Sequence, residues 1–424
     1  MLIESNYWLT TLKPAIFPET PLPAKVDVAV IGAGFSGLSA ALTLAKAGLS
    51  VAVLEAETIG WGASSRNGGM VLTGMKLGLE TLIQRYGKER ARRMFALSLA
   101  SIATVEEIVR DENIDCAFSR CGHLEMAWKP SHFDSYARAA EIMERELGHS
   151  VRMIPRAEQH AEIGSDLYHG GLVDEVSAGL NPAQFVMGLG QAAAKAGAQL
   201  HEKTRVLQIE SLGAEFVVHT ARGLVRAGKV FVGTSGYTGR ATPSVQKRII
   251  PIGSYIIATA PLSGELAREV SPRNRMIFDS KNYLYYFRLT PDNRMLFGGR
   301  AAFLPETPSS VRDSAPILRQ GMLQVYPQLK DVPVEYVWGG SLDFASDLMP
   351  HAGVLDGYHH AIGYAGHGVA FATQLGQLVA EKMLGRDVEN PLDGLLFPKI
   401  PLYNGTPWFL PLAGAYYKLL DLIT

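Results

Sequence analysis

The sequence predicts an α/β fold: a Rossmann-type dinucleotide-binding domain interleaved with an α+β domain built on a large, mainly antiparallel sheet. A β-branched run at 26–31 is typical of a buried parallel strand, and a glycine-rich turn at 32–37 follows it directly. An Ala- and Leu-rich segment at 38–47 predicts a helix that ends at Gly48, and the apolar run at 51–54 predicts a second strand. These segments make one βαβ unit, and later alternating segments indicate the antiparallel sheet.

The glycine-rich turn contains three glycines with separate functions in nucleotide binding. Gly32 permits the tight turn out of the strand, Gly34 lets the backbone approach a pyrophosphate, and Gly37 lets the helix pack close to the sheet. Glu55 ends the second strand, where an acidic side chain accepts hydrogen bonds from ribose hydroxyls and disfavours the 2′-phosphate of NADP. The unit therefore predicts a dinucleotide site, and the alternative is an α/β core with a glycine-rich turn and no ligand.

The composition argues against several other classes of protein. The chain has 424 residues, with 40 Lys and Arg against 41 Asp and Glu, so we expect no long-range field that attracts nucleic acid. The two cysteines, Cys116 and Cys121, are too few for a disulfide framework or a zinc site, and we expect no metal. The first residues lack the pattern of a signal peptide, and no apolar run is long enough to span a membrane. We therefore expect a cytoplasmic protein without a transmembrane span.

A Gly- and Ser-rich stretch at 59–69 follows the second strand, where a simple NAD enzyme would continue with regular β-α repeats. Its small residues allow close approach to an extended ligand, and Arg66 or Asn67 can contact phosphate or ring atoms. On these residues alone, a surface loop is an equal alternative.

Several segments together resemble the D-amino-acid-oxidase-like family of flavoproteins, which includes glycine oxidase and sarcosine oxidase. The resemblance covers the turn at 32–37 and the loop at 62–69, and it continues at 204–206, 229–236 and 363–369. It implies a glutathione-reductase-like FAD-binding domain, in which the last segment opens a helix whose N-terminus stabilises negative charge on reduced flavin. The FAD contacts that the resemblance implies are Gly32, Ala33, Gly34, Phe35, Ser36, Gly37, Glu55, Ala56, Gly62, Ala63, Ser64, Ser65, Arg66, Asn67, Gly68, Gly69, Val206, Thr234, Gly236, Gly366, His367, Gly368 and Val369.

The resemblance also bears on how the FAD is attached. No cysteine occurs at 348–353, where sarcosine oxidase carries the cysteine that binds its flavin, and no histidine occurs in the loop at 62–69. Because both departures remove the expected attachment points, we expect FAD to be bound non-covalently.

The rest of the chain predicts the second domain, which in the resembled family covers the substrate cavity. Periodicity and turn signals predict helices at 86–111 and 132–147, strands at 121–128 and 249–259, and an antiparallel hairpin of 283–289 with 294–298. The predicted division is an FAD-binding domain of 25–112, 152–246 and 334–390, a substrate domain of 113–151 and 247–333, an N-terminal extension of 1–24, and an apolar C-terminal tail of 391–424.

Aromatic and basic residues of the predicted sheet are candidate substrate contacts. Tyrosines can bind an amine through cation–π contacts, and strand alternation puts Tyr286 and Arg288 on one face of their strand. Arg288 could meet a carboxylate at the far end of the substrate. The candidate substrate contacts are Tyr255, Tyr286, Arg288 and Trp338, with ordinary sheet packing as the alternative for the aromatic residues. His367 is the candidate catalytic residue, and its alternative function is to shape the loop at the flavin edge.

The segment after Trp338 departs from the family pattern. Glycine and D-amino-acid oxidases carry an arginine just after the corresponding glycine, and it binds the α-carboxylate of the substrate. Here the stretch at 339–343 contains no arginine. An α-amino acid would lose its bidentate charge partner, so the departure favours an amine whose reacting carbon bears no carboxylate. Asp343 and Asp347 are expected to be surface acids, with attraction of a cation as the alternative.

Within the family, the resemblance is narrower to the γ-glutamylputrescine oxidase group, and it rests on the segments at 62–69, 282–283, 286–294, 364–369 and 414–417. It implies hydride transfer from the carbon beside a neutral amine to flavin N5, giving an imine and then an aldehyde, ammonia and H2O2 from O2. One alternative is a glycine- or sarcosine-type oxidase of N-substituted amino acids, and another is a membrane-associated FAD dehydrogenase that reduces a quinone. A nucleotide-binding module without catalysis is the alternative from a different class. The apolar tail at 406–424 either docks on its own protein or makes a peripheral contact with the inner face of the membrane.

Overall fold

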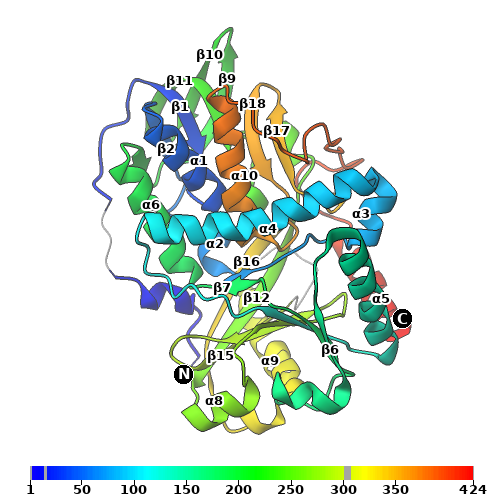
Figure 1. Ribbon diagram of the computed structural model, residues 1–424. Coiled ribbons are helices and arrows are strands. Elements are labelled where there is room, and N and C mark those ends of the chain that lie inside the picture. Colours follow the sequence, from blue (N-terminus) through cyan, green and yellow to red (C-terminus); the bar gives the residue numbers. More distant parts are fainter. Residues whose placement is uncertain (1, 14–16, 300–306, 424) are drawn as a thin grey trace.

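A computed structural model describes residues 2–13, 17–299 and 307–423 (Figure 1). These residues form two eight-stranded sheets and a two-stranded ribbon. Figure 1 shows the first sheet and its helices in the upper half of the molecule, and the second sheet with helices α8 (Gly264–Val270) and α9 (Pro308–Val325) below it. The predicted fold, an α/β domain interleaved with an α+β domain, is therefore confirmed.

The first sheet is the predicted dinucleotide-binding unit. Strand β1 (Lys25–Ile31), helix α1 (Phe35–Lys46) and strand β2 (Val51–Leu54) follow one another, and β1 pairs in parallel with β2. Parallel strands need a crossover helix, and the buried Ala and Leu side chains of α1 pack it onto the sheet. The strand order is β17 (His351–Leu355), β18 (Tyr358–Ile362), β11 (Gly223–Val232), β1, β2 and β8 (Gln199–His201), with β10 (Glu215–Thr220) and β9 (Val206–Leu212) added to β11.

Among the described residues, three helices pack on this sheet and a fourth lies on one of them, around one apolar core. Helix α1 packs against α10 (Gly368–Met383) and α6 (Pro182–Lys195), and α4 (Lys88–Asp111) packs against α10. The predicted helix at 86–111 begins at Lys88, because Gly87 with φ +79° separates it from α3 (Leu79–Tyr86).

The second sheet is antiparallel except where β4 (His123–Met126) and β13 (Met276–Asp279) pair in parallel. The predicted hairpin is confirmed, with β14 (Tyr285–Leu289) and β15 (Arg294–Gly299) paired across the turn at 290–293. One face of this sheet packs Leu124, Ile277 and Phe287 against α9 in a second apolar core, and alternation turns the opposite face toward the first domain. The strand order is β16 (Val334–Phe344), β12 (Ile250–Pro261), β15 (Arg294–Gly299), β14 (Tyr285–Leu289), β13 (Met276–Asp279), β4 (His123–Met126), β6 (Gly171–Asp174) and β5 (Arg152–Ile154).

The sheets do not follow the expected domain boundaries. Strands β5 and β6 belong to the second sheet although 152–246 was assigned to the FAD-binding domain, and β16 pairs with β12 although 334–390 was assigned there. Short apolar strands carry no signal for which sheet they join, because pairing is decided by partners far away in the sequence. Helix α5 (Pro130–Leu147) closely matches the helix predicted at 132–147.

Both ends of the chain carry short helices. The expected N-terminal extension contains the 3-10 helix η1 (Tyr7–Thr11), in which Trp8 is fully buried. The tail ends in α11 (Leu410–Ile423), where the carboxylate of Asp421 accepts hydrogen bonds from the backbone N–H groups of Asn282 and Tyr283. The tail is therefore held in part by contacts with the rest of the protein, while its residues Leu412, Tyr416 and Leu419 are exposed.

Candidate active site

A cavity of about 1290 Å³ lies between the two sheets. Ordinary small-molecule pockets have volumes of roughly 300–1,000 Å³, so this one has room for a dinucleotide together with a substrate. Its lining combines the carboxyl ends of β1 and β2, the loop at 62–68, the segment at 364–369 and the inward face of the second sheet.

Among the helices of the described residues, none has both the length and the apolar character of a transmembrane span. Among the same residues, no cluster of three His, Cys, Asp or Glu side chains could hold a metal ion.

The glycine-rich turn has the close contacts that a dinucleotide site requires. Gly32 adopts φ +96°, a conformation that favours glycine. A Cβ on Gly34 would lie 2.8 Å from Ser64 Oγ, and a Cβ on Gly37 would lie 2.0 Å from the carbonyl oxygen of Gly32. Because Gly34 has no side chain, its backbone stays accessible from the cavity. Because Gly37 has none, α1 can lie close to the end of β1. Both agree with a pyrophosphate seated at the N-terminus of α1.

Glu55 lies where the ribose of a dinucleotide would bind. Its carboxylate accepts hydrogen bonds from the backbone N–H groups of Ala33 and Glu57, each at 2.8 Å. Burial raises the pKa of this carboxyl, although the backbone donors oppose the rise. The side chain lines the cavity beside Ala56, so the acid is held in place before any ligand arrives.

The loop at 62–69 contains one helical turn, α2 (Ala63–Arg66), that packs over the glycine-rich turn. The hydroxyl of Ser64 accepts from the backbone N–H of Phe35 at 3.0 Å. Asn67 does not extend into the cavity with its amide, because Nδ2 donates to the carbonyls of Ala63 and Ser64 while Oδ1 accepts from the N–H of Gly69. The loop is therefore held by its own side chains rather than laid loosely on the surface.

Two tryptophans support this loop from outside. The indole N–H of Trp338 donates to the carbonyl of Arg66 at 2.9 Å, and that of Trp8 donates to the carbonyl of Asn67 at 3.0 Å. Arg66 donates to the carbonyls of Trp61 and Gly339, which joins the loop to β16. Sequence reasoning assigned no function to Trp8, because a single tryptophan in an N-terminal segment carries no signal of its distant partner.

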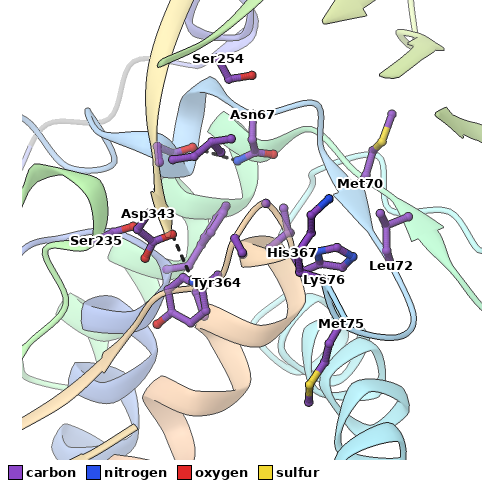
Figure 2. Close-up of a pocket in the computed structure, with 18 of the residues that line it drawn as sticks. Asn67, Met70, Leu72, Met75, Lys76, Ser235, Ser254, Asp343, Tyr364 and His367 are labelled. Atoms are coloured by element: carbon purple, nitrogen blue, oxygen red, sulfur yellow. Dashed lines mark hydrogen bonds between the residues drawn. The ribbon is translucent and has the colours of Figure 1, made fainter. Parts of the chain in front are cut away.

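Asp343 positions the segment that enters α10. It is 3% exposed, and its carboxylate accepts from the backbone N–H groups of Gly363 at 2.6 Å and Tyr364 at 3.2 Å (Figure 2). Burial raises the pKa of Asp343 to about 6, and the hydrogen bonds to the carboxylate limit that rise. The expectation of a surface acid is wrong, because the strand that carries Asp343 turns its side chain inward at the domain junction. Tyr364 is fixed further by a 2.6 Å hydrogen bond between its hydroxyl and that of Ser36.

His367 lies at the N-terminus of α10 and lines the cavity. Figure 2 shows it beside Lys76, which comes from the segment after the loop at 62–69. Burial, and after it the charge of Lys76, lowers the pKa of His367 to about 4. The imidazole is therefore neutral at pH 7, and its Nδ1 has no hydrogen-bond partner among the described residues.

Residues 27–382 match the family described as DAO, FAD dependent oxidoreductase. The chain belongs to the DAO family of FAD-dependent oxidoreductases. This DAO enzyme uses FAD, and its relatives are amine and amino-acid oxidoreductases.

Individual relatives match over nearly the whole chain. The DAO enzyme is 35% identical over 423 residues to a probable oxidoreductase OrdL of Rhizobium meliloti, a match that covers 98% of this chain and 97% of the relative. It is 33% identical over 423 residues to the gamma-glutamylputrescine oxidoreductase of Escherichia coli, covering 99% and 98%. Its fold is similar to the crystal structure of glycine oxidase from Geobacillus kaustophilus, with a TM-score of 0.74, 21% identity, and coverage of 90% of this chain and all of that one.

The predicted FAD contacts divide into residues that line the cavity and residues that shape it. Five predicted contacts, all among the described residues, lie outside the lining: Ala33, Gly37, Ser65, Gly69 and Gly236. A Cβ on Gly69 would lie 2.1 Å from the carbonyl oxygen of Leu180, so this glycine serves close packing. The cavity is lined by Gly32, Gly34, Phe35, Ser36, Glu55, Ala56, Gly62, Ala63, Ser64, Arg66, Asn67, Gly68, Val206, Thr234, Gly366, His367, Gly368 and Val369.

Of the four substrate candidates, the structure brings only Tyr286 into the described lining of the cavity. Its hydroxyl lies 3.1 Å from Ser254 Oγ. Tyr255 is buried in the core beneath the sheet, where its hydroxyl donates to Ser310, so the alternation that faces Tyr286 inward turns Tyr255 away. Trp338 is the support for the loop at 62–69 described above.

Arg288 also lies outside the described lining, so the expectation that it meets a substrate carboxylate is not supported. Its Nη1 donates to the carbonyls of Gly69 at 3.2 Å and Leu180 at 2.9 Å. Burial lowers the pKa of Arg288 to about 10, which still leaves the guanidinium charged at pH 7. A buried arginine does need partners, as expected, but here the partners are backbone carbonyls of the domain junction.

Proposed function

We propose that this DAO enzyme oxidises a terminal primary amine of the γ-glutamylputrescine type. The carbon beside the amine loses a hydride, and water hydrolyses the resulting imine to an aldehyde and ammonia. FAD supplies the hydride acceptor when bound, and O2 takes the electrons and becomes H2O2. The name of the Escherichia coli relative supports this choice within the coarser class of amine and amino-acid oxidoreductases.

The observation that carries the proposal is the missing carboxylate partner at β16. Gly340, Ser341 and Leu342 line the cavity, and the segment has no arginine where amino-acid oxidases of the resembled family bind the α-carboxylate. Arg288 does not replace that arginine, because its donors are directed to the carbonyls of Gly69 and Leu180. A substrate carboxylate at the reacting carbon would therefore lose a charge-assisted, bidentate pair, whereas a terminal amine loses nothing there.

The residues around His367 favour binding of the substrate with its amine in the neutral form. Lys76 lies beside His367, and its charge already lowers the proton affinity of that imidazole. An ammonium group brought to the same place would meet the same unfavourable charge, so the bound amine gives up its proton to solvent before hydride transfer. His367 then orients the amine as a neutral hydrogen-bonding group rather than removing a proton.

The test is anaerobic flavin reduction with a panel of γ-glutamylputrescine, putrescine, sarcosine, glycine and D-alanine. We expect the fastest reduction with γ-glutamylputrescine, a rate that rises between about pH 6 and 9, and peroxide formation when oxygen is readmitted. Fast reduction by sarcosine with none by the terminal amines would instead establish an N-substituted amino-acid oxidase. Quinone reduction without peroxide would establish a dehydrogenase.

We also propose that FAD is bound without a covalent link and that the enzyme is cytoplasmic, acting in putrescine catabolism. Cys116 is buried, with its pKa raised by that burial to about 12, so it is a poor nucleophile toward flavin. Neither it nor Cys121 belongs to the described lining of the cavity. Both thiols are unpaired, which is usual in a reducing compartment. Flavin released into solution by acid precipitation would support the first proposal, and flavin that stays with the pellet would contradict it.

A further inference from the structure

The inward face of the second sheet carries a pair of polar residues that are not among the predicted FAD contacts. His123 and Glu125 lie two residues apart on β4, so they share one face, and both line the cavity. On the neighbouring strand β13, Phe278 stands opposite Glu125, and its ring stacks on His123 with centroids 5.4 Å apart. Leu124, between the two polar residues, points into the core on the other side of the sheet. We call His123 and Glu125 the roof pair.

His123 is held so that it presents a hydrogen-bond donor to the cavity. Its side chain is 5% exposed, and Nδ1 lies 2.8 Å from the hydroxyl oxygen of Ser177. That oxygen already accepts from the backbone N–H of Thr73 at 3.0 Å, and the described residues offer the Ser177 hydroxyl proton no other acceptor than Nδ1. When the hydroxyl donates to Nδ1, the ring proton must be on Nε2.

The donor at Nε2 has no hydrogen-bond partner among the described residues, although it is fully buried. The nearest carboxylate oxygen, Glu125 Oε1, is 3.5 Å away and does not complete a hydrogen bond. A buried donor without a partner costs free energy, so its presence in a cavity wall indicates a ligand that supplies the acceptor.

Glu125 presents the opposite kind of group beside this donor. Its side chain is 31% exposed, and it carries acceptors only when ionised. Tyr136 from α5 lines the cavity as well, and burial, and after it the charge of the neighbouring Glu125, raises the pKa of its hydroxyl. The cavity roof therefore offers one N–H donor and one carboxylate acceptor side by side.

We propose that the roof pair binds an amide group of the substrate, with His123 Nε2–H donating to its carbonyl oxygen and Glu125 accepting from its N–H. An ammonium group has donors only and would leave Nε2–H unpaired. A carboxylate would accept from His123 but would be repelled by Glu125. Of these three groups, an amide alone satisfies both side chains, which makes the roof pair the part of the site that distinguishes the amide of a γ-glutamylputrescine-type substrate from the ammonium group of a free diamine.

The position of the pair agrees with this assignment. His123 lines the cavity from the second sheet and His367 lines it from the start of α10, so the roof pair and the flavin-edge segment border the same space. An amine beside His367 and an amide at the roof pair are the two ends of one acylated diamine. The inference rests on the proposed amine oxidation, because the amine end defines which carbon reacts.

The test compares N-acetylputrescine, which keeps the amide, with putrescine, which lacks it. His123→Phe keeps the ring against Phe278 but removes the donor, and we expect kcat/KM for N-acetylputrescine to fall about tenfold while putrescine changes by less than about twofold. His123→Gln restores a donor and should recover part of the loss. Glu125→Gln keeps a carbonyl acceptor and should change neither substrate by more than about threefold. His160→Ala, a surface histidine 59% exposed, is the matched control.

Equal losses for both substrates in His123→Phe would overturn the proposal. So would a selective loss of putrescine in Glu125→Gln, because that result would make the pair an ammonium site. N-butylacetamide, an amide with no oxidisable amine, separates failure of this inference from failure of the proposed oxidation. It should perturb the flavin absorbance of the wild type and not that of His123→Phe even if no amine reduces the flavin, and identical titrations of both proteins would overturn the amide site.

Discussion

Replacement of Gly37 by alanine should separate α1 from β1 and release FAD. The new Cβ would lie 2.0 Å from the carbonyl oxygen of Gly32 and 3.2 Å from a methyl carbon of Val30. A carbon and a carbonyl oxygen need roughly 3.2 Å, so the helix must move by about 1 Å, because the contact is to a backbone oxygen in the tight turn between β1 and α1 and not to the end of a flexible side chain. Overpacking of this kind costs about 3 kcal/mol, and the same movement displaces the N–H groups that face the pyrophosphate.

The assay is thermal unfolding together with the flavin-to-protein absorbance ratio after gel filtration. Gly264→Ala is the matched control, because Gly264 is also a helical glycine and its Cβ would meet nothing closer than a 3.6 Å contact with the end of Arg268. We expect Gly37→Ala to melt several degrees lower and to lose flavin, and Gly264→Ala to melt at or above the wild-type temperature. A Gly37→Ala protein that keeps its flavin and its melting temperature would refute the close-packing argument.

Three further replacements test single residues of the site. Below pH ~4, Asp343→Asn should weaken flavin retention and lower stability by about 1–3 kcal/mol, because the new NH2 group faces backbone donors. Burial raises the folded-state pKa of Asp343 to about 6, so its stabilising contribution is complete below pH ~4 and is lost as pH rises to about 6. In urea unfolding, wild-type stability should therefore fall relative to that of Asp343→Asn across this window, and parallel curves would contradict the buried carboxyl. Arg288→Met should lower stability by about 2 kcal/mol and leave KM unchanged, whereas a raised KM with unchanged stability would return Arg288 to the substrate site. His367→Gln should lower the rate of flavin reduction without changing its dependence on pH between 6 and 9, because the pKa of His367 is about 4; loss of that dependence would make His367 the titrating group.

Asp343 and Arg288 show how the two halves of the molecule depend on each other. Asp343 comes from a strand of the second sheet and holds the segment that opens α10 of the first domain. Arg288 comes from the same sheet and ties together the carbonyls of Gly69 and Leu180. The site is thus assembled by charged side chains buried at the junction, and loosening either one should alter FAD binding before it alters substrate affinity.

The sequence by itself determined the dinucleotide unit, because everything that unit needs is local. Gly32, Gly34, Gly37 and Glu55 lie within one short βαβ segment, and their functions follow from turn geometry, close packing and the helix N-terminus. The hairpin of β14 and β15 was equally accessible, since its turn residues and alternation are adjacent in the chain.

Only the tertiary structure decided the substrate side of the cavity. The sheet to which β6 and β16 belong, the burial of Asp343 and the inward face of His123 all depend on partners far away in the sequence. Alternation indicates which residues share a face but not which face meets the cavity. Tyr286 lines the cavity while Tyr255 packs beneath the sheet, and the sequence did not distinguish the two tyrosines. Long-range packing chooses that face, and it leaves no local pattern in the residues that it selects.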